Sequence, residues 1–126
     1  MSESPTVLYV EDNPDNRNLI QRILMADGFN VVLAEDAAMA FKYLEQEQPS
    51  LILMDINMPE VDGYTLTARI KSMPRMGNVP IIALTANVMK GDREKTLEAG
   101  CDGYIQKPVD VDELPRQIAQ YLEASQ

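Results

Sequence analysis

The chain has 126 residues, 45% of them hydrophobic and 25% charged, which is enough for one domain with a sizeable core. Its 20 acidic and 11 basic residues give a formal charge of −9, which disfavours binding to nucleic acid or to an anionic membrane. Histidine is absent, so a Ser–His–Asp triad and a histidine-ligated zinc site are excluded within the chain. The lone cysteine, Cys101, excludes a disulfide framework and is expected to be a small core residue.

Short apolar runs alternate with longer segments of helical periodicity. Val7–Val10 and Leu51–Met54 are apolar at every position, which is typical of central parallel strands buried on both faces. The runs expected to be strands are Thr6–Val10, Asn30–Ala34, Leu51–Met54, Ile81–Leu84 and Tyr104–Ile105.

Each run is followed by a segment expected to be a helix. Asn13 and Pro14 predict an N-cap and a first-turn proline, and Gly28 predicts where that helix ends. Pro115 would remove a backbone donor from the last helix unless that helix starts later than Asp110. The later helices are expected at Ala37–Gln46, through Leu66, Ile70 and Met73 up to Pro74, at Met89–Ala99 before Gly100, and at Val111–Ala124, with Asp110 and Glu113 spaced as a capping box.

Five strand–helix units in strict alternation predict a doubly wound α/β sheet with helices on both faces. No linker, repeat or low-complexity segment interrupts the pattern, so we expect a single domain over residues 1–126. No apolar run approaches the roughly 20 residues of a membrane span, and the first residues lack the pattern of a signal peptide. With a single cysteine, this favours a cytoplasmic protein.

In such a sheet, ligands bind beyond the carboxyl ends of the strands. Polar side chains follow four of the predicted strands, and we expect them to line one crevice. They are Glu11 and Asp12 after the first strand, Asp55 after the third, Thr85 after the fourth, and Lys107 with Pro108 after the fifth.

Crowded acids in this crevice require either a cation or shifted pKa values, because two carboxylates about 4 Å apart repel by roughly 4 kcal/mol at an effective dielectric near 20. A donor set of oxygens without histidine or cysteine favours a hard ion, and we predict that this ion is Mg²⁺. Lys107 adds a second positive charge and Thr85 a hydroxyl donor. Together these groups describe a pocket for a phosphoryl group.

The acceptor of that phosphoryl group is expected to be a carboxylate, because histidine is absent and Cys101 lies outside the crevice. We assign Asp55 as the acceptor and Glu11 with Asp12 as metal ligands. The backbone carbonyl of Asn57 is a further candidate ligand. Plainer interpretations stay open: the acids as helix-start charges, and Lys107 and Thr85 as ordinary surface and strand-end residues.

The motifs that carry a family resemblance are Glu11-Asp12-Asn13, Met54-Asp55-Ile56-Asn57-Met58-Pro59, Asp62-Gly63, Leu84-Thr85-Ala86 and Lys107-Pro108. In order and spacing they resemble bacterial response-regulator receiver domains of the CheY-like superfamily, over nearly the whole chain. The run Ala83–Pro108 is most similar to stand-alone DivK-like regulators and to the receivers of hybrid kinases. The resemblance implies a five-unit (βα) fold of flavodoxin-like topology, with strand order 2-1-3-4-5.

The resemblance also implies the partners and the metal. Asp55 takes a phosphoryl group from the phosphohistidine of a sensor histidine kinase or a histidine phosphotransfer protein. Mg²⁺ is bound by Asp12, Asp55 and the carbonyl of Asn57, with Glu11 acting partly through water.

The implied switch uses other residues. Thr85 and Lys107 bind the phosphoryl oxygens, and Tyr104 is the aromatic that turns inward when Thr85 moves. The bond before Pro108 is cis. The face of the fourth helix, fifth strand and fifth helix then changes its binding to a downstream effector protein. We expect no attached output domain, and we expect a monomer or weak dimer that catalyses only its own phosphorylation and slow dephosphorylation.

Three alternatives remain at this point. A haloacid-dehalogenase-like phosphatase needs a second acid two residues after its nucleophile, where this chain has Asn57. A flavodoxin-like electron carrier needs a phosphate loop after the first strand, where this chain is acidic. A receiver that binds partners without phosphate is disfavoured because each expected pocket residue is present.

Overall fold

A computed structural model describes residues 4–56, 62–86 and 90–124, with the side chains of residues 90–93 left out. Its centre is a five-stranded parallel sheet in the order β2-β1-β3-β4-β5, as the resemblance implies. Asn57, whose carbonyl is a candidate metal ligand, and Met89, the expected start of the fourth helix, lie outside the described residues. The strands are β1 (Thr6–Val10), β2 (Asn30–Ala34), β3 (Leu51–Asp55), β4 (Ile81–Thr85) and β5 (Gly103–Gln106).

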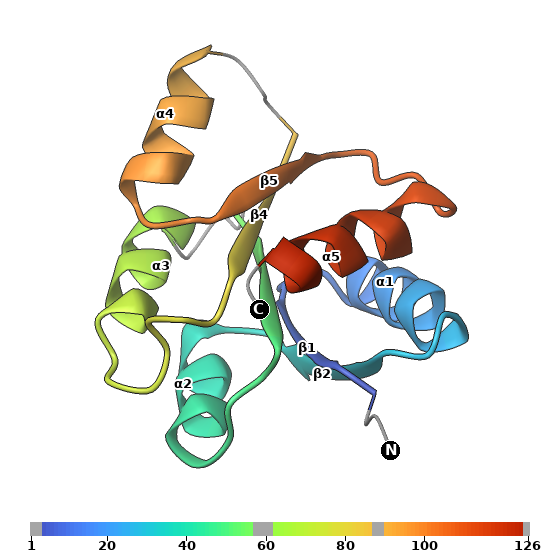
Figure 1. Ribbon diagram of the computed structural model, residues 1–126, viewed down its shortest axis with the longest axis horizontal. Helices are drawn as coiled ribbons and strands as arrows, with labels where there is room; N and C mark the ends of the chain where they lie inside the picture. Colours follow the sequence, from blue (N-terminus) through green and yellow to red (C-terminus); the bar gives the residue numbers. More distant parts are fainter. Residues whose placement is uncertain (1–3, 57–61, 87–89, 125–126) are drawn as a thin grey trace.

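The helices form one layer on each side of the sheet (Figure 1). Helices α1 (Pro14–Ala26) and α5 (Glu113–Ala124) lie together on one side. Helices α2 (Ala37–Gln46), α3 (Gly63–Lys71) and α4 (Lys90–Glu98) lie on the other. Each of the described helices is too short or too polar to cross a bilayer.

Alternation along the strands explains why both layers are needed. In β1, Val7 and Tyr9 join the core beneath α1 and α5, whereas Leu8 and Val10 join the core beneath α2 and α3. All four residues are buried, as are the five residues of β3. A central parallel strand therefore presents apolar side chains to both sides, which confirms the interpretation of the continuous apolar runs.

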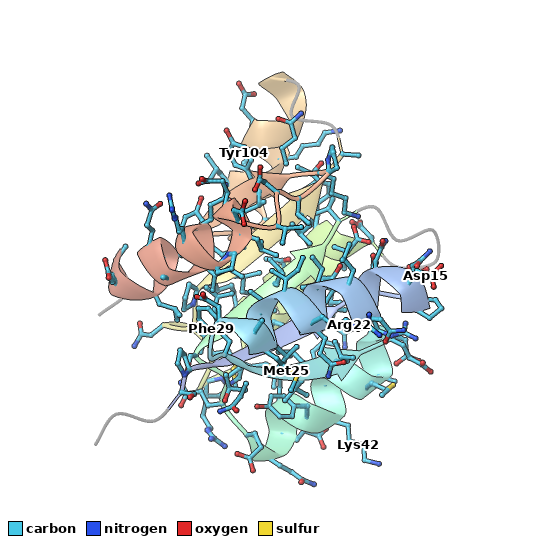
Figure 2. The ribbon with its side chains drawn as sticks, turned by 90° about the vertical axis from the view of Figure 1, so that its right-hand side faces the viewer. Asp15, Arg22, Met25, Phe29, Lys42 and Tyr104 are labelled. Atoms are coloured by element: carbon cyan, nitrogen blue, oxygen red, sulfur yellow. The ribbon has the colours of Figure 1, made fainter. Side chains whose placement is uncertain are left out.

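Helix α1 begins and ends where its sequence predicts. The Asn13 side-chain oxygen accepts a hydrogen bond from the backbone N–H of Asn16 at 3.0 Å, and Pro14 occupies the first turn. At the other end, Gly28 adopts a φ of +92°, a left-handed conformation that glycine reaches without steric cost. Figure 2 shows Asp15 at one end of this helix and Met25 toward the other.

Two helix boundaries differ by two residues from the sequence prediction, and α4 ends at Glu98, one residue before the expected Ala99. The last helix begins at Glu113 rather than Val111. Asp110 still caps it as the spacing predicts, because Asp110 Oδ1 accepts the backbone N–H groups of Asp112 and Glu113 at 2.9 and 3.1 Å. Pro115 therefore falls in the first turn, where a missing N–H removes no bond within the helix. The third helix ends at Lys71, earlier than Met73, because the chain from there to Val79 follows a series of tight turns.

At the edge of the sheet where β4 and β5 begin, a lysine joins three segments. Lys71 Nζ lies 2.8 Å from Asp102 Oδ2 and donates to the carbonyl of Val79 at 2.8 Å. Asp102 Oδ2 also accepts the backbone N–H of Ile81 at 2.8 Å. We call these residues the Lys71 clamp; it fixes the turn before β5 against the end of α3.

Candidate functional site

Three carboxylates meet at the carboxyl ends of β1 and β3. These strands are neighbours, with Val10 paired to Met54, so the residues that follow them lie side by side. Glu11, Asp12 and Asp55 each offer an oxygen, and these oxygens lie within 4.8 Å of one another. The sequence therefore predicted correctly that these acids come together.

Glu11 is the most buried of the three. Its side chain is 0% exposed, and among the described residues its Oε2 atom is a buried oxygen with no hydrogen-bond partner. Burial, followed by the nearby Asp55 carboxyl, raises the pKa of Glu11 to about 7. An unpartnered buried carboxylate oxygen facing two further acids is costly without a cation, so the donor set fits a hard divalent ion.

Lys107 reaches the same place from the end of β5. Its Nζ lies 2.8 Å from Asp55 Oδ1, and Asp55 is only 3% exposed. The backbone N–H of Lys107 donates to the carbonyl of Thr85 at 2.8 Å, which extends the pairing of β4 and β5. The bond between Lys107 and Pro108 is cis, as the resemblance implies. Asp55 is thus a buried carboxylate held by an ammonium group.

These side chains line a polar cleft of about 420 Å³ that also includes Asn13, Pro14 and Asn16. A negatively charged wall faces one positive side chain across it. Such a cleft suits a cation together with an oxyanion, because the acids hold the one and Lys107 attracts the other.

Comparison with known proteins identifies the family. The family model described as the response regulator receiver domain matches residues 7–119. The chain belongs to the response regulator receiver domain family. The polar-differentiation response regulator DivK of Brucella anthropi is 37% identical over 117 residues, which cover 93% of this chain and 95% of DivK.

Two further relatives show the setting in which such domains occur. The response regulator Rre1 of Synechocystis is 38% identical over 127 residues, but the chain spans only 55% of its length. The crystal structure of the receiver domain of the sensor histidine kinase PA1611 from Pseudomonas aeruginosa is 39% identical, covers 95% of this chain and 98% of that one, and has a TM-score of 0.86. That receiver domain contains a magnesium ion coordinated in its active-site cleft.

The family assignment places the chain in phosphorelay signalling and does not favour the phosphatase alternative.

Two other expected site residues, Thr85 and Tyr104, do not line the acid cleft. Thr85 is buried at the end of β4, next to the strand that carries Asp55, but it is not among the residues that line the cleft. Tyr104 is half-buried and packs with the core beneath α2 and α3, on the opposite side of the sheet from Tyr9.

Three residues of the receiver site were not identified from the sequence. Asn16 Nδ2 donates to Glu11 Oε1 at 2.7 Å, and the Tyr9 hydroxyl makes a longer contact of 3.5 Å to the same oxygen. Arg17 Nη1 donates to the backbone carbonyl of Glu11 at 2.9 Å. Burial, followed by the charges of Glu11 and Asp55, raises the pKa of Tyr9, so it remains a neutral donor.

A signal for Asn16 is present in the sequence. It lies in the first turn of a helix whose side chains lean back toward its amino end, and that end lies against Glu11, the residue after β1. A polar side chain at this position can therefore reach the acids, as the contact of the exposed Asn16 with Glu11 shows.

Proposed function

We propose that the chain accepts a phosphoryl group on Asp55 from the phosphohistidine of a partner protein, in a reaction that requires Mg²⁺. The observation that carries this proposal is the buried Asp55 carboxylate, held by Lys107 at 2.8 Å beside two further acids. The magnesium ion seen in the PA1611 receiver domain supports the choice of metal.

The proposed transfer needs little from the protein beyond position and charge. An Asp55 carboxylate oxygen forms a bond to phosphorus while the bond from phosphorus to the donor's imidazole nitrogen breaks, and that nitrogen keeps the electron pair. Lys107 stabilises the negative charge of the transferred oxygens, and Thr85 offers them a hydroxyl donor from the end of β4. A bound Mg²⁺, held by Glu11, Asp12, Asp55 and the Asn57 carbonyl, would supply charge neutralisation to the same oxygens.

A groove beside the cleft supports docking of a donor protein. It has a volume of about 390 Å³ and lies between α1 and the chain that follows β5. Leu19, Ile20, Pro108 and Val109 give it an apolar lining, and Lys107 lines both the groove and the acid cleft. A histidine kinase or histidine phosphotransfer protein seated here would present its phosphohistidine close to Asp55.

The output of the proposed switch is a change in protein contacts. Leu97 of α4 and Val111 before α5 are exposed apolar side chains in the segments that precede and follow β5, the strand of Tyr104, which suits a surface that binds a downstream effector. We place this exchange in the cytoplasm, in keeping with the free Cys101, and assign to the chain no chemistry beyond its own phosphorylation and slow dephosphorylation.

The test is phosphorylation by acetyl phosphate, followed by intact mass. The parent protein is expected to gain one phosphoryl group with Mg²⁺ and none with EDTA, and Asp55→Asn is expected to gain none. Asp36→Asn is the matched control, because Asp36 caps α2 and asparagine caps a helix equally well. Equal labelling of the parent and Asp55→Asn would remove Asp55 from the proposed role.

A further inference from the structure

The two oxygens of Glu11 have different surroundings. Oε1 accepts the amide of Asn16 at 2.7 Å and is approached by the Tyr9 hydroxyl at 3.5 Å. Oε2 is buried and has no hydrogen-bond partner among the described residues. The carboxylate is therefore fixed with one oxygen occupied and the other available to the acid cleft.

Asn16 is well placed to maintain this asymmetry. It lies in the first turn of α1, where Asn13 and Pro14 set the start of the helix, and it lines the same cleft as Glu11 and Asp12. Arg17, the next residue, donates to the Glu11 carbonyl at 2.9 Å, so the first turn of α1 holds both the backbone and the side chain of Glu11. Glu11 cannot turn its carboxylate without losing the contact with Asn16.

The number of oxygens that a carboxylate offers helps to decide which cation it prefers. Mg²⁺ takes about six ligands in a strict octahedron and keeps several waters, so single oxygens suit it. Ca²⁺ accepts about 6–8 ligands and readily takes both oxygens of one carboxylate. A carboxylate restrained to one oxygen therefore favours the smaller ion.

We propose that Asn16 is a positioning residue that restricts Glu11 to a single oxygen toward a divalent cation and so makes the site prefer Mg²⁺ over Ca²⁺. The inference rests on the proposed function, since it concerns the same acids, but it concerns ion selection rather than phosphoryl acceptance. Its basis is the contact of Asn16 with Oε1 and the unpartnered state of Oε2.

The experiment measures Mg²⁺ and Ca²⁺ dissociation constants by calorimetry at about pH 8, where carboxyl groups are ordinarily ionised. The variants are Asn16→Ala and Asn16→Leu, both of which remove the donor. Asn18→Ala and Asn18→Leu are the matched controls, since Asn18 is an exposed asparagine on the same helix. Circular dichroism in EDTA checks that each variant is folded, and using two substitutions guards against a defect in one of them.

In the Asn16 variants we expect Mg²⁺ affinity to fall about 10-fold, as for other residues that orient a metal ligand, while Ca²⁺ affinity stays the same or rises. The Asn18 variants are expected to keep the parent values for both ions. In a Glu11→Gln background the Asn16 change should have no further effect on the ratio of the two constants, because the two residues act as a pair.

An unchanged ratio of Ca²⁺ to Mg²⁺ constants in folded Asn16 variants would overturn the inference, whether both constants shift equally or neither does. Acetyl phosphate labelling separates this failure from failure of the proposed function. If the ratio is unchanged but the parent is labelled in the presence of Mg²⁺, the inference fails and the proposed function stands. If the parent protein binds neither ion, both the inference and the proposed function fail.

Discussion

Helices α1 and α4 both follow strands of the sheet, yet they are attached to it very differently. In α1 the N-cap is satisfied by Asn13, and Ile20, Ile23 and Leu24 are buried. In the described side chains of α4, from Glu94 to Glu98, only Thr96 is buried, and Leu97 is 52% exposed.

The difference indicates which helix holds the site and which is free to respond. Full burial of an aliphatic side chain contributes about 1.5–3 kcal/mol, so the three apolar side chains of α1 outweigh the contacts described for α4. A segment with few buried apolar contacts opens or shifts at low cost. Helix α1 can therefore fix the acids while α4 changes position.

The largest expected effect is on stability. Leu24→Ala in α1 should lower the free energy of unfolding by about 2–5 kcal/mol, because Leu24 is 0% exposed and its removal leaves a cavity. Leu97→Ala in α4 should change the free energy by no more than about 0.5 kcal/mol. Urea unfolding followed by circular dichroism measures both. Equal losses in the two variants would contradict the contrast between the helices.

A smaller effect is expected from pH at the end of α1. Glu11 ordinarily titrates near pH 4.5, but in the folded protein its pKa is about 7 because of burial and the Asp55 carboxyl. Between these values the folded protein keeps a proton that the unfolded chain releases. Without metal, the free energy of unfolding should therefore fall by on the order of 1–3 kcal/mol as pH rises through this window, and should not fall further above it.

Urea unfolding of the parent and Glu11→Gln in EDTA isolates this contribution. Glutamine does not titrate, so the variant should lack the part of the slope that belongs to Glu11. Added Mg²⁺ should stabilise the parent more above pH 7 than near pH 4.5, because it binds the ionised carboxylate. Parallel pH curves for parent and variant would show that Glu11 is not the group responsible.

The smallest expected effect is a shift in population. Beryllofluoride with Mg²⁺, as a mimic of the phosphoryl group, should move the amide resonances of Tyr104 and of α4 from Glu94 to Glu98. In α1, the amides from Ile20 onward should stay close to their original positions, because that part is packed on the core. In Figure 2, Tyr104 and α1 lie in separate parts of the molecule. Amide shifts confined to the acid cleft would show that the proposed output face is wrong.

Much of the fold could be predicted from the sequence because its signals are local. Continuous apolar runs at β1 and β3, the N-cap at Asn13 and the glycine at position 28 each act within a few residues. The start of α5 was placed two residues too early, although Asp110 was identified as its cap, because helix periodicity alone does not show where the regular backbone hydrogen bonds begin.

The site was predicted less completely, for a physical reason. The acids follow strand ends, so the order of the strands is enough to bring Glu11 and Asp55 together. The asymmetry of the Glu11 carboxylate depends on which of its two oxygens the Asn16 side chain contacts, and no spacing in the sequence gives that choice. Roles that depend on one contact between side chains therefore could not be predicted from the sequence.

The Lys71 clamp has a consequence for how α4 can be displaced. Asp102 is tied to both Lys71 and the backbone of Ile81, so the chain just beyond Glu98 is anchored at the lower edge of the sheet. Helix α4 is then expected to pivot about its carboxyl end, with the greatest travel at its amino end near the acids. A perturbation at the acid cleft would thus displace the amino end of α4 most, while the Lys71–Asp102 ion pair and the Asp102–Ile81 hydrogen bond hold the chain beyond its carboxyl end in place.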